Sequence, residues 1–229
     1  MDKIVSYQQQ GNVATITLDD GKVNVLSHAM LDALERAFDR AQESRAIVVL
    51  RGREGKFSAG FDLSEMSKGP QNALKLTTKG SEMAHRILCF PTPVIGVSTG
   101  HCIAMGAFLM LTCDYRIGLN GSFRTGLNET LIGMTMHHFG IELARYRLPT
   151  SYFNRCVINA ELFNPENAML AGFYDAVVTP ETIDAEIAKT VDSFSKLNMG
   201  AFYGTKTKSR MAVLALLDDC IERDLNMRF

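Results

Sequence analysis

The pattern of apolar and polar residues divides the first half of the chain into short strands and helices. Asn12–Leu18 alternates in a period of two after a turn signal at Gly11, and this predicts a hairpin with Ile4–Gln8. Further short strands are predicted at Ala46–Leu50, Val94–Val97 and Tyr115–Ile117. Two glycine-containing segments between them, 54–62 and 100–106, are predicted as a loop and a turn.

Apolar residues at helical spacing predict helices between and after these strands. Ser27 is a candidate cap for a helix that carries Leu31, Leu34 and Phe38 on one face. The other predicted helices are Asn72–Cys89, Ala107–Thr112, Ser151–Asn159, Pro165–Ala171, Thr182–Leu197 and one within Ala201–Met227. The pattern indicates a mixed α/β fold with a strand-rich core and a helical C-terminal part. Its crossovers are too short for a doubly wound sheet.

Composition places the chain among ordinary globular proteins. It has 229 residues, 46% of them hydrophobic and 21% charged, which fits one large domain or one domain with an appendage. The net charge of −1 gives no broad attraction to nucleic acid or to an anionic membrane. The five cysteines include no C-x-x-C pair, which argues against a disulfide framework or a zinc site. No apolar run is long enough for a signal peptide or a membrane span, so we expect a cytoplasmic protein.

Two short stretches rich in small residues are candidates for backbone donors. In Phe57–Leu63, Gly60 permits positive φ and lets the backbone approach a ligand, so that Phe61 donates its N–H. In Gly100–Phe108, an apolar turn opens a short helix, whose first N–H groups are unpaired. A plain strand-to-helix loop and a tightly packed turn are the alternatives.

The third stretch, Gly126–Glu129, presents one carboxylate between apolar neighbours. Apolar surroundings raise the pKa of a carboxyl group, which suits a base that takes and returns a proton near neutral pH. A surface glutamate on a loop is the alternative. Two preorganised N–H donors with one such base are sufficient to form and stabilise an enolate.

The sequence around these stretches resembles one family over nearly the whole chain. The matching motifs are K-V-N-V-L-S at Lys22–Ser27, F-S-A-G-F-D-L at Phe57–Leu63, P-V-I-G-V-S-T-G-H at Pro93–His101, C-D-Y-R-I at Cys113–Ile117 and G-L-N-E-T at Gly126–Thr130. They are similar to those of the crotonase superfamily, also called the enoyl-CoA hydratase/isomerase family. Three of them most resemble the mitochondrial-type Δ3,Δ2-enoyl-CoA isomerases.

The resemblance implies a fold, an assembly and a set of site residues. The fold is a spiral of ββα repeats over residues 1–149, followed by a shortened helical region, 150–229, that forms homotrimers or hexamers. The oxyanion hole consists of the backbone N–H groups of Phe61 and Met105, and Glu129 is the catalytic base. The residues expected to contact the acyl-CoA substrate are Ser58, Ala59, Gly60, Gly106 and Phe108. Coenzyme A is then part of the substrate, and no separate cofactor or metal is expected.

The choice of reaction depends on one position. Hydratases of this superfamily have a second glutamate where this chain has Phe108, and a phenyl ring displaces the water that hydration needs. We therefore expect an isomerase in which Glu129 moves a proton from C2 to C4 of a 3-enoyl thioester. A 2-enoyl-CoA hydratase or other crotonase chemistry, and a non-catalytic acyl-CoA-binding module, are the alternatives. His137 and His138, in a predicted loop, make a poor metal pair and are interpreted as solvent-facing.

Overall fold

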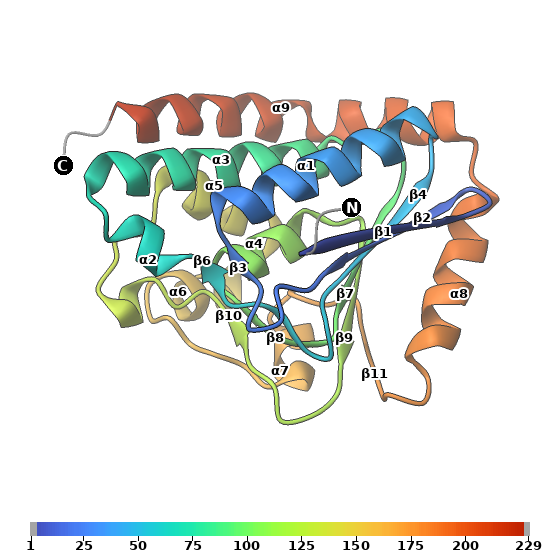
Figure 1. The fold of residues 1–229 in the computed structure, drawn as a ribbon, viewed down its shortest axis with the longest axis horizontal. Coiled ribbons are helices and arrows are strands. Elements are labelled where there is room, and N and C mark those ends of the chain that lie inside the picture. Colours follow the sequence, from blue (N-terminus) through green and yellow to red (C-terminus); the bar gives the residue numbers. More distant parts are fainter. Residues whose placement is uncertain (1–3, 227–229) are drawn as a thin grey trace.

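A six-stranded sheet forms the centre of the molecule (Figure 1). The computed structural model describes residues 4–226. The strand order is β1-β2-β4-β7-β9-β11; β1 is antiparallel to β2, and the other neighbours are parallel. The strands are β1 (Val5–Gln10), β2 (Val13–Leu18), β4 (Ile47–Arg51), β7 (Val94–Ser98), β9 (Tyr115–Leu119) and β11 (Ala176–Val178). The hairpin and the three further strands predicted from the sequence are confirmed.

Two smaller sheets carry the strands that follow those of the large sheet. One has the order β10-β8-β5 and the other pairs β3 with β6. Their strands are β3 (Val25–Leu26), β5 (Gly55–Ser58), β6 (Gly60–Phe61), β8 (Gly100–Ile103) and β10 (Thr125–Gly126). The predicted loop over 54–62 and turn over 100–106 are therefore wrong in part. These strands are short, four of the five contain a glycine, and each pairs with a strand distant in the sequence, so they have no local signature.

A helix completes each of these strand–strand units. The chain runs β2-β3-α1, then β4-β5-β6-α2-α3, then β7-β8-α4, which is a repeated spiral of two strands and a helix. The first helices are α1 (His28–Glu43), α2 (Leu63–Met66), α3 (Pro70–Leu88) and α4 (Met105–Thr112). The Ser27 side chain accepts the N–H of Met30 and caps α1, as predicted. The spiral places strand ends from successive units next to each other.

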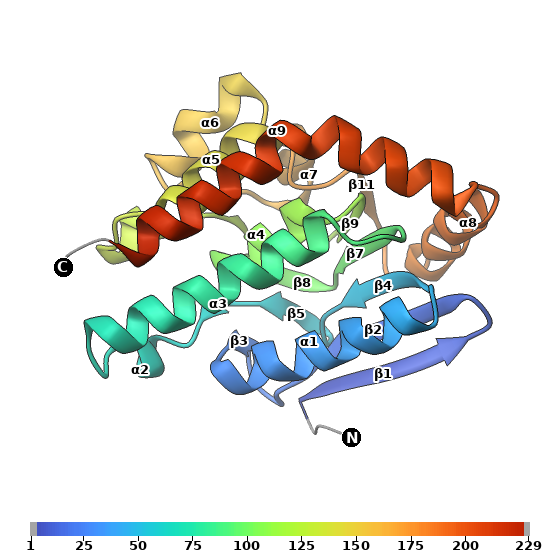
Figure 2. The ribbon, with the colours of Figure 1, turned by 90° about the horizontal axis from the view of Figure 1, so that it is seen from above.

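The C-terminal part is mostly helical and shares the core of the spiral. Its helices are α5 (His138–Arg147), α6 (Thr150–Val157), α7 (Pro165–Leu170), α8 (Ile183–Ser195) and α9 (Met199–Leu225). Helix α5 was not predicted, and β11 adds a strand to the region predicted as helical. Helices α1, α3 and α9 lie side by side (Figure 2). Within residues 4–226, no helix is long and apolar enough to cross a membrane.

Buried ion pairs attach α9 to the spiral. Lys206 Nζ lies 2.7 Å from Asp114 Oδ2, and Arg210 Nη2 lies 3.0 Å from Asp114 Oδ1. Arg210 also donates to the carbonyl of Leu88 at the end of α3, at 2.6 Å. All three charged side chains are buried, and removing one partner of such a group leaves an uncompensated charge. The C-terminal helix is therefore held in a fixed position against α3.

Candidate active site

Gly60 brings two turns of the spiral into direct contact. Its φ of +90° is unfavourable for residues with a side chain, and a Cβ placed there would lie 2.7 Å from Ala104 Cβ and 3.4 Å from Met105 N. Because no side chain intervenes, the backbone of Gly60–Phe61 packs against the start of α4. The structure therefore brings together the two predicted donor residues, Phe61 and Met105.

Strand pairing directs the Phe61 amide away from β3. The next amide, that of Asp62, donates to the carbonyl of Leu26 at 3.3 Å. Consecutive N–H groups of a strand point to opposite edges, so the Phe61 N–H points to the other edge of β6, where α4 begins. Ser58 holds this turn, since its hydroxyl donates to Asn24 O at 2.7 Å and accepts the Gly60 N–H at 3.1 Å.

The second donor lies in a strained turn. Ala104 has φ 50° and ψ −126°, a conformation that residues other than glycine rarely adopt. Its N–H donates to the carbonyl of Gly126 at 2.9 Å, which ties this turn to β10. Met105 is the first residue of α4, so its N–H has no partner within the helix and lies at the positive end of the helix dipole. The sequence singled out this stretch but not Ala104 itself.

Glu129 lies three residues beyond Gly126 and is enclosed by protein. It follows β10 and begins a short 3-10 helix, η1 (Thr130–Ile132), and the residue is 9% exposed. Burial raises the pKa of its carboxyl group to about 7. Its Oε2 has no hydrogen-bond partner among the residues that the structure describes. The carboxylate therefore has the environment expected of a base that exchanges protons near neutral pH.

Two cavities meet at Glu129 and Phe61. The first, which we call the Ala59 cavity, has a volume of roughly 340 Å³. It is lined by Val25, Ala59, Phe61, Asp62, Leu63, Ser64, Met66, Ala104, Asn128, Glu129, Ile132 and Met134. The second, the His137 cavity, has a volume of roughly 330 Å³. It is lined by Phe61, Met66, Ala73, Leu74, Thr77, Glu129, Met134, Thr135, His137 and Asp224. Four residues line both cavities: Phe61, Met66, Glu129 and Met134.

The other predicted contact residues occupy different places around these cavities. Ala59 is exposed and lines the first cavity. Gly106 lies against Ser58, where a Cβ would be 2.6 Å from Ser58 Cβ, so this close contact joins the two turns that carry Phe61 and Met105. Phe108 is fully buried and lines neither cavity; its ring packs edge-on against His137 with centroids 6.0 Å apart.

The position of His137 shows that its interpretation as a solvent-facing residue was wrong. It does not face solvent: it lines the cavity that contains Glu129, and its Nε2 is enclosed without a hydrogen-bond partner in the described part of the chain. The error followed from missing α5, which begins at His138 and fixes the preceding residue against Phe108 and Phe139. No residue pattern near His137 indicated that placement.

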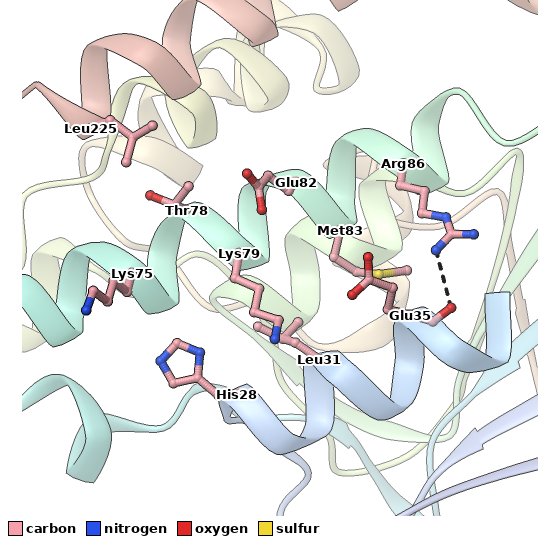
Figure 3. Close-up of a pocket in the computed structure, with 10 residues that line it drawn as sticks. All are labelled: His28, Leu31, Glu35, Lys75, Thr78, Lys79, Glu82, Met83, Arg86 and Leu225. Carbon is pink, nitrogen blue, oxygen red and sulfur yellow. Dashed lines mark hydrogen bonds between the residues drawn. The ribbon is translucent and has the colours of Figure 1, made fainter. Parts of the chain in front are cut away.

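A third cavity lies elsewhere and contains none of the predicted site residues. It has a volume of roughly 390 Å³ and lies between α1 and α3, near the end of α9 (Figure 3). Its charged lining residues are of both signs, among them Glu35, Lys75 and Lys79. Over residues 4–226, no three His, Cys, Asp or Glu side chains are placed to hold a metal ion.

The structure thus brings together a buried carboxylate and two closely packed turns, one of which ends in the unpaired first N–H group of a helix. Residues 8–213 match the family model of enoyl-CoA hydratase/isomerase. The chain belongs to the enoyl-CoA hydratase/isomerase family, whose members are enzymes. The crotonase fold predicted from the motifs is thereby confirmed.

Relatives of both reaction types are similar to this chain. A crystal structure of an enoyl-CoA hydratase/isomerase family protein from Pseudomonas syringae is 47% identical, with a TM-score of 0.97 over 99% of this chain and 98% of the other. The human mitochondrial enoyl-CoA delta isomerase 1 is 27% identical over 93% of this chain and 72% of its own length. A probable enoyl-CoA hydratase of Bacillus subtilis is 29% identical over 58% of this chain and 54% of its own length.

Proposed function

We propose that this protein is an enoyl-CoA isomerase that moves a double bond from C3 to C2 of an acyl-CoA thioester. The observation that carries the proposal is the environment of Glu129, a single buried carboxylate with a raised pKa at the junction of two cavities. Coenzyme A enters as part of the substrate. The delta isomerase name of the human relative supports the same reaction.

Two other carboxylates border these cavities, but both already accept hydrogen bonds at the start of a helix. Asp62 accepts the N–H of Ser64 at 2.9 Å and its hydroxyl at 2.6 Å, and these bonds lower the pKa of the carboxyl. Asp224 accepts the N–H groups of His138 and Phe139 at 2.8 and 3.0 Å. The lowered pKa keeps the Asp62 carboxylate ionised and makes it a weak base, and both oxygens of Asp224 are occupied by backbone N–H groups. Glu129 alone of the three is free to exchange a proton.

The proposed reaction uses this one base twice. The thioester oxygen is held by the N–H groups of Phe61 and Met105, and ionised Glu129 removes a proton from C2. The electron pair of that C–H bond forms a C1–C2 double bond, and negative charge collects on the thioester oxygen. Glu129 then returns the proton to C4. The thioester carbonyl re-forms, the electrons of the C1–C2 double bond form a C2–C3 double bond, and those of the C3–C4 double bond take the proton. Hydration additionally needs a held water, and the second glutamate of hydratases is replaced by the buried ring of Phe108.

A substrate panel tests the proposal. With 3-enoyl-CoA thioesters of several chain lengths in deuterated water, we expect conversion to 2-enoyl-CoA and exchange of the C2 proton in the remaining 3-enoyl substrate. With 2-enoyl-CoA we expect slow or no formation of 3-hydroxyacyl-CoA at the same enzyme concentration. Hydration as the faster reaction would make the protein a hydratase. Binding with no exchange at C2 would make it a non-catalytic acyl-CoA-binding module.

The rate of proton exchange is expected to depend on pH through Glu129. Only the ionised carboxylate removes a proton, so the rate falls as pH decreases below about 7, the pKa of this group in the folded protein. A pH–rate profile of exchange at C2 measures this value. A profile that is flat down to the ordinary glutamate pKa of 4.5 would contradict the assignment of the base.

Assembly into homotrimers or hexamers remains part of this proposal. Helix α9 leaves several large apolar side chains exposed, including Tyr203 at 45% and Met211 at 69%. Exposed apolar side chains on this helix support a subunit interface there.

A further inference from the structure

Asn24 is a fully buried polar residue that directly precedes β3 and lines neither of the two cavities. Its φ of +54° lies in the left-handed region, which asparagine tolerates better than most residues with a side chain. Its side-chain nitrogen donates to the carbonyls of Leu18 at 2.9 Å and Phe57 at 3.1 Å. Its side-chain oxygen accepts the N–H of Asp20 at 2.9 Å. This one amide therefore joins the end of β2, the loop after it and β5.

Asp20 fixes the backbone on the other side of Asn24. Its carboxylate accepts the N–H groups of Lys22 at 2.7 Å, Asn24 at 2.9 Å and Val25 at 3.1 Å. Because the N–H of Asp20 is bonded in turn to the Asn24 side chain, each residue holds the other in place. The two side chains together determine where β3 begins.

The pairing of β3 with β6 depends on such an anchor because both strands are very short. Only two residues of each strand pair, Val25 with Gly60 and Leu26 with Phe61. Even a longer isolated pair of strands is marginally stable in water. The direction of the Phe61 N–H toward α4 therefore depends on the groups that hold these two strands from outside the pair.

Ser58 connects Asn24 to the turn that contains Gly60. Its hydroxyl donates to the backbone carbonyl of Asn24 at 2.7 Å and accepts the N–H of Gly60 at 3.1 Å. Ser58 is itself buried, so bulk water does not compete for these bonds. A displacement of Asn24 is therefore transmitted to Gly60 and to the amide that follows it, that of Phe61.

We propose that Asn24 is a positioning residue for the oxyanion hole. Its side-chain amide, acting through Ser58 and Gly60, keeps the N–H of Phe61 directed at the same point as the N–H of Met105. This inference rests on the proposed function, because it needs a thioester oxygen held by these two N–H groups. Asn24 contacts no substrate, so its effect on the reaction is transmitted by the backbone alone.

Two substitutions remove the amide in different ways. Asn24→Gly adopts positive φ without strain, so it removes only the side-chain bonds. Asn24→Asp keeps the size of the side chain, but its carboxylate cannot donate and lies against the carbonyls of Leu18 and Phe57. A displaced oxyanion donor loses part of its contribution, so we expect kcat to fall roughly tenfold in Asn24→Gly and further in Asn24→Asp. Affinity for a saturated acyl-CoA, measured by calorimetry, is expected to change little.

Binding of a 3-ketoacyl-CoA measures the oxyanion hole without turnover. The C2 protons of this thioester lie between two carbonyl groups, so it ionises to an enolate that is detected by its ultraviolet absorbance. Two N–H groups that converge on the thioester oxygen stabilise the enolate and lower the pH at which the bound ligand ionises. We expect this pH to be about one unit higher in Asn24→Gly than in the wild type, which corresponds to the roughly tenfold loss in kcat.

Thr92→Val is the control for loss of a buried side-chain hydrogen bond elsewhere in the fold. Thr92 is buried, lines neither cavity and donates to the carbonyl of Ala46. We expect this variant to unfold at a lower denaturant concentration, as the Asn24 variants do. Its kcat and the ionisation of the bound 3-ketoacyl-CoA are expected to equal those of the wild type.

Wild-type values of both kcat and ligand ionisation in Asn24→Gly would overturn the inference, and so would equal losses in Thr92→Val. If the Asn24 variants do not fold, Ser58→Ala still tests it, because this substitution breaks only the link to Gly60. An unchanged ionisation of the bound ligand in Ser58→Ala would also overturn the inference.

The wild-type protein distinguishes this inference from the proposed reaction. If it stabilises the bound enolate but does not isomerise 3-enoyl-CoA, the proposed reaction is refuted, and a shifted ionisation in Asn24→Gly still supports the role of Asn24. If the wild type binds the 3-ketoacyl-CoA without favouring its enolate, the oxyanion hole and the role of Asn24 are both refuted.

Discussion

Glu129→Gln is expected to lower the rate of proton exchange at C2, and of isomerisation, by about 10²- to 10⁴-fold, the usual contribution of a general base. Glutamine fills the same volume but cannot accept the proton. Binding of a saturated acyl-CoA is expected to change little, because the oxyanion donors are backbone groups. Stopped-flow absorbance with a 3-enoyl-CoA substrate measures the rate, and calorimetry measures the binding.

The same substitution is expected to stabilise the fold at high pH. The pKa of Glu129 is about 7 in the folded protein and about 4.5 as its ordinary value. Between these values the folded state binds more protons than the unfolded state, so the wild type loses stability as pH rises. The variant lacks this loss, so above pH 7 its free energy of unfolding exceeds that of the wild type by up to about 3 kcal/mol. Denaturant unfolding at several pH values measures it.

Glu222→Gln provides a matched control for Glu129→Gln, because Glu222 is exposed on α9. We expect it to leave the exchange rate unchanged. Wild-type turnover in Glu129→Gln would show that another group is the base.

Gly60→Ala is expected to reduce kcat by about 10²- to 10³-fold, the loss associated with one oxyanion donor. The added Cβ would lie 2.7 Å from Ala104 Cβ, and the backbone has φ +90°. The turn must move away from α4, which separates the N–H groups of Phe61 and Met105. We also expect a loss of about 1–3 kcal/mol in the free energy of unfolding, from strain at positive φ. Steady-state kinetics and denaturant unfolding measure the two effects.

Gly11→Ala is a control that shows the effect of strain at positive φ without any displacement of the turn at Gly60. Gly11 also has positive φ, +58°, but a Cβ there would meet nothing within 4 Å, and the residue lies in the β1–β2 hairpin. We expect it to lose stability without losing kcat. Comparable kcat values in the two glycine variants would argue that the contact between Gly60 and α4 does not shape the site.

Local sequence was sufficient to predict the parts of the site that depend on backbone chemistry. Gly60 was predicted as a point of close backbone approach, and the structure places it against Ala104. Met105 was predicted at the start of a helix with an unpaired N–H, and α4 begins there. Glu129 was predicted in apolar surroundings, and it is buried. Their catalytic roles remain predictions that the two substitutions above test.

The cavity beyond Glu129 was not predictable in this way. His137 was interpreted as solvent-facing because it was placed with His138 in a predicted loop, where the two adjacent histidines make a poor metal pair. Its burial depends on Phe108 from α4 and Phe139 from α5, and on Asp224 from α9, which caps α5. These partners are separated by long stretches of chain, and no periodic pattern connects them.

Sequence alone determined five of the six strands of the large sheet, most of the helices, the family and the three stretches that are proposed to carry the chemistry. It did so because hydrophobic period, helix capping and glycine conformation act within a few residues. Tertiary structure decided which atoms face each other: the contact of Gly60 with α4, the enclosure of Glu129 between two cavities, and the unpaired nitrogen of His137. Those features arise from the stacking of successive spiral units, since packing energy depends on neighbours in space rather than in sequence.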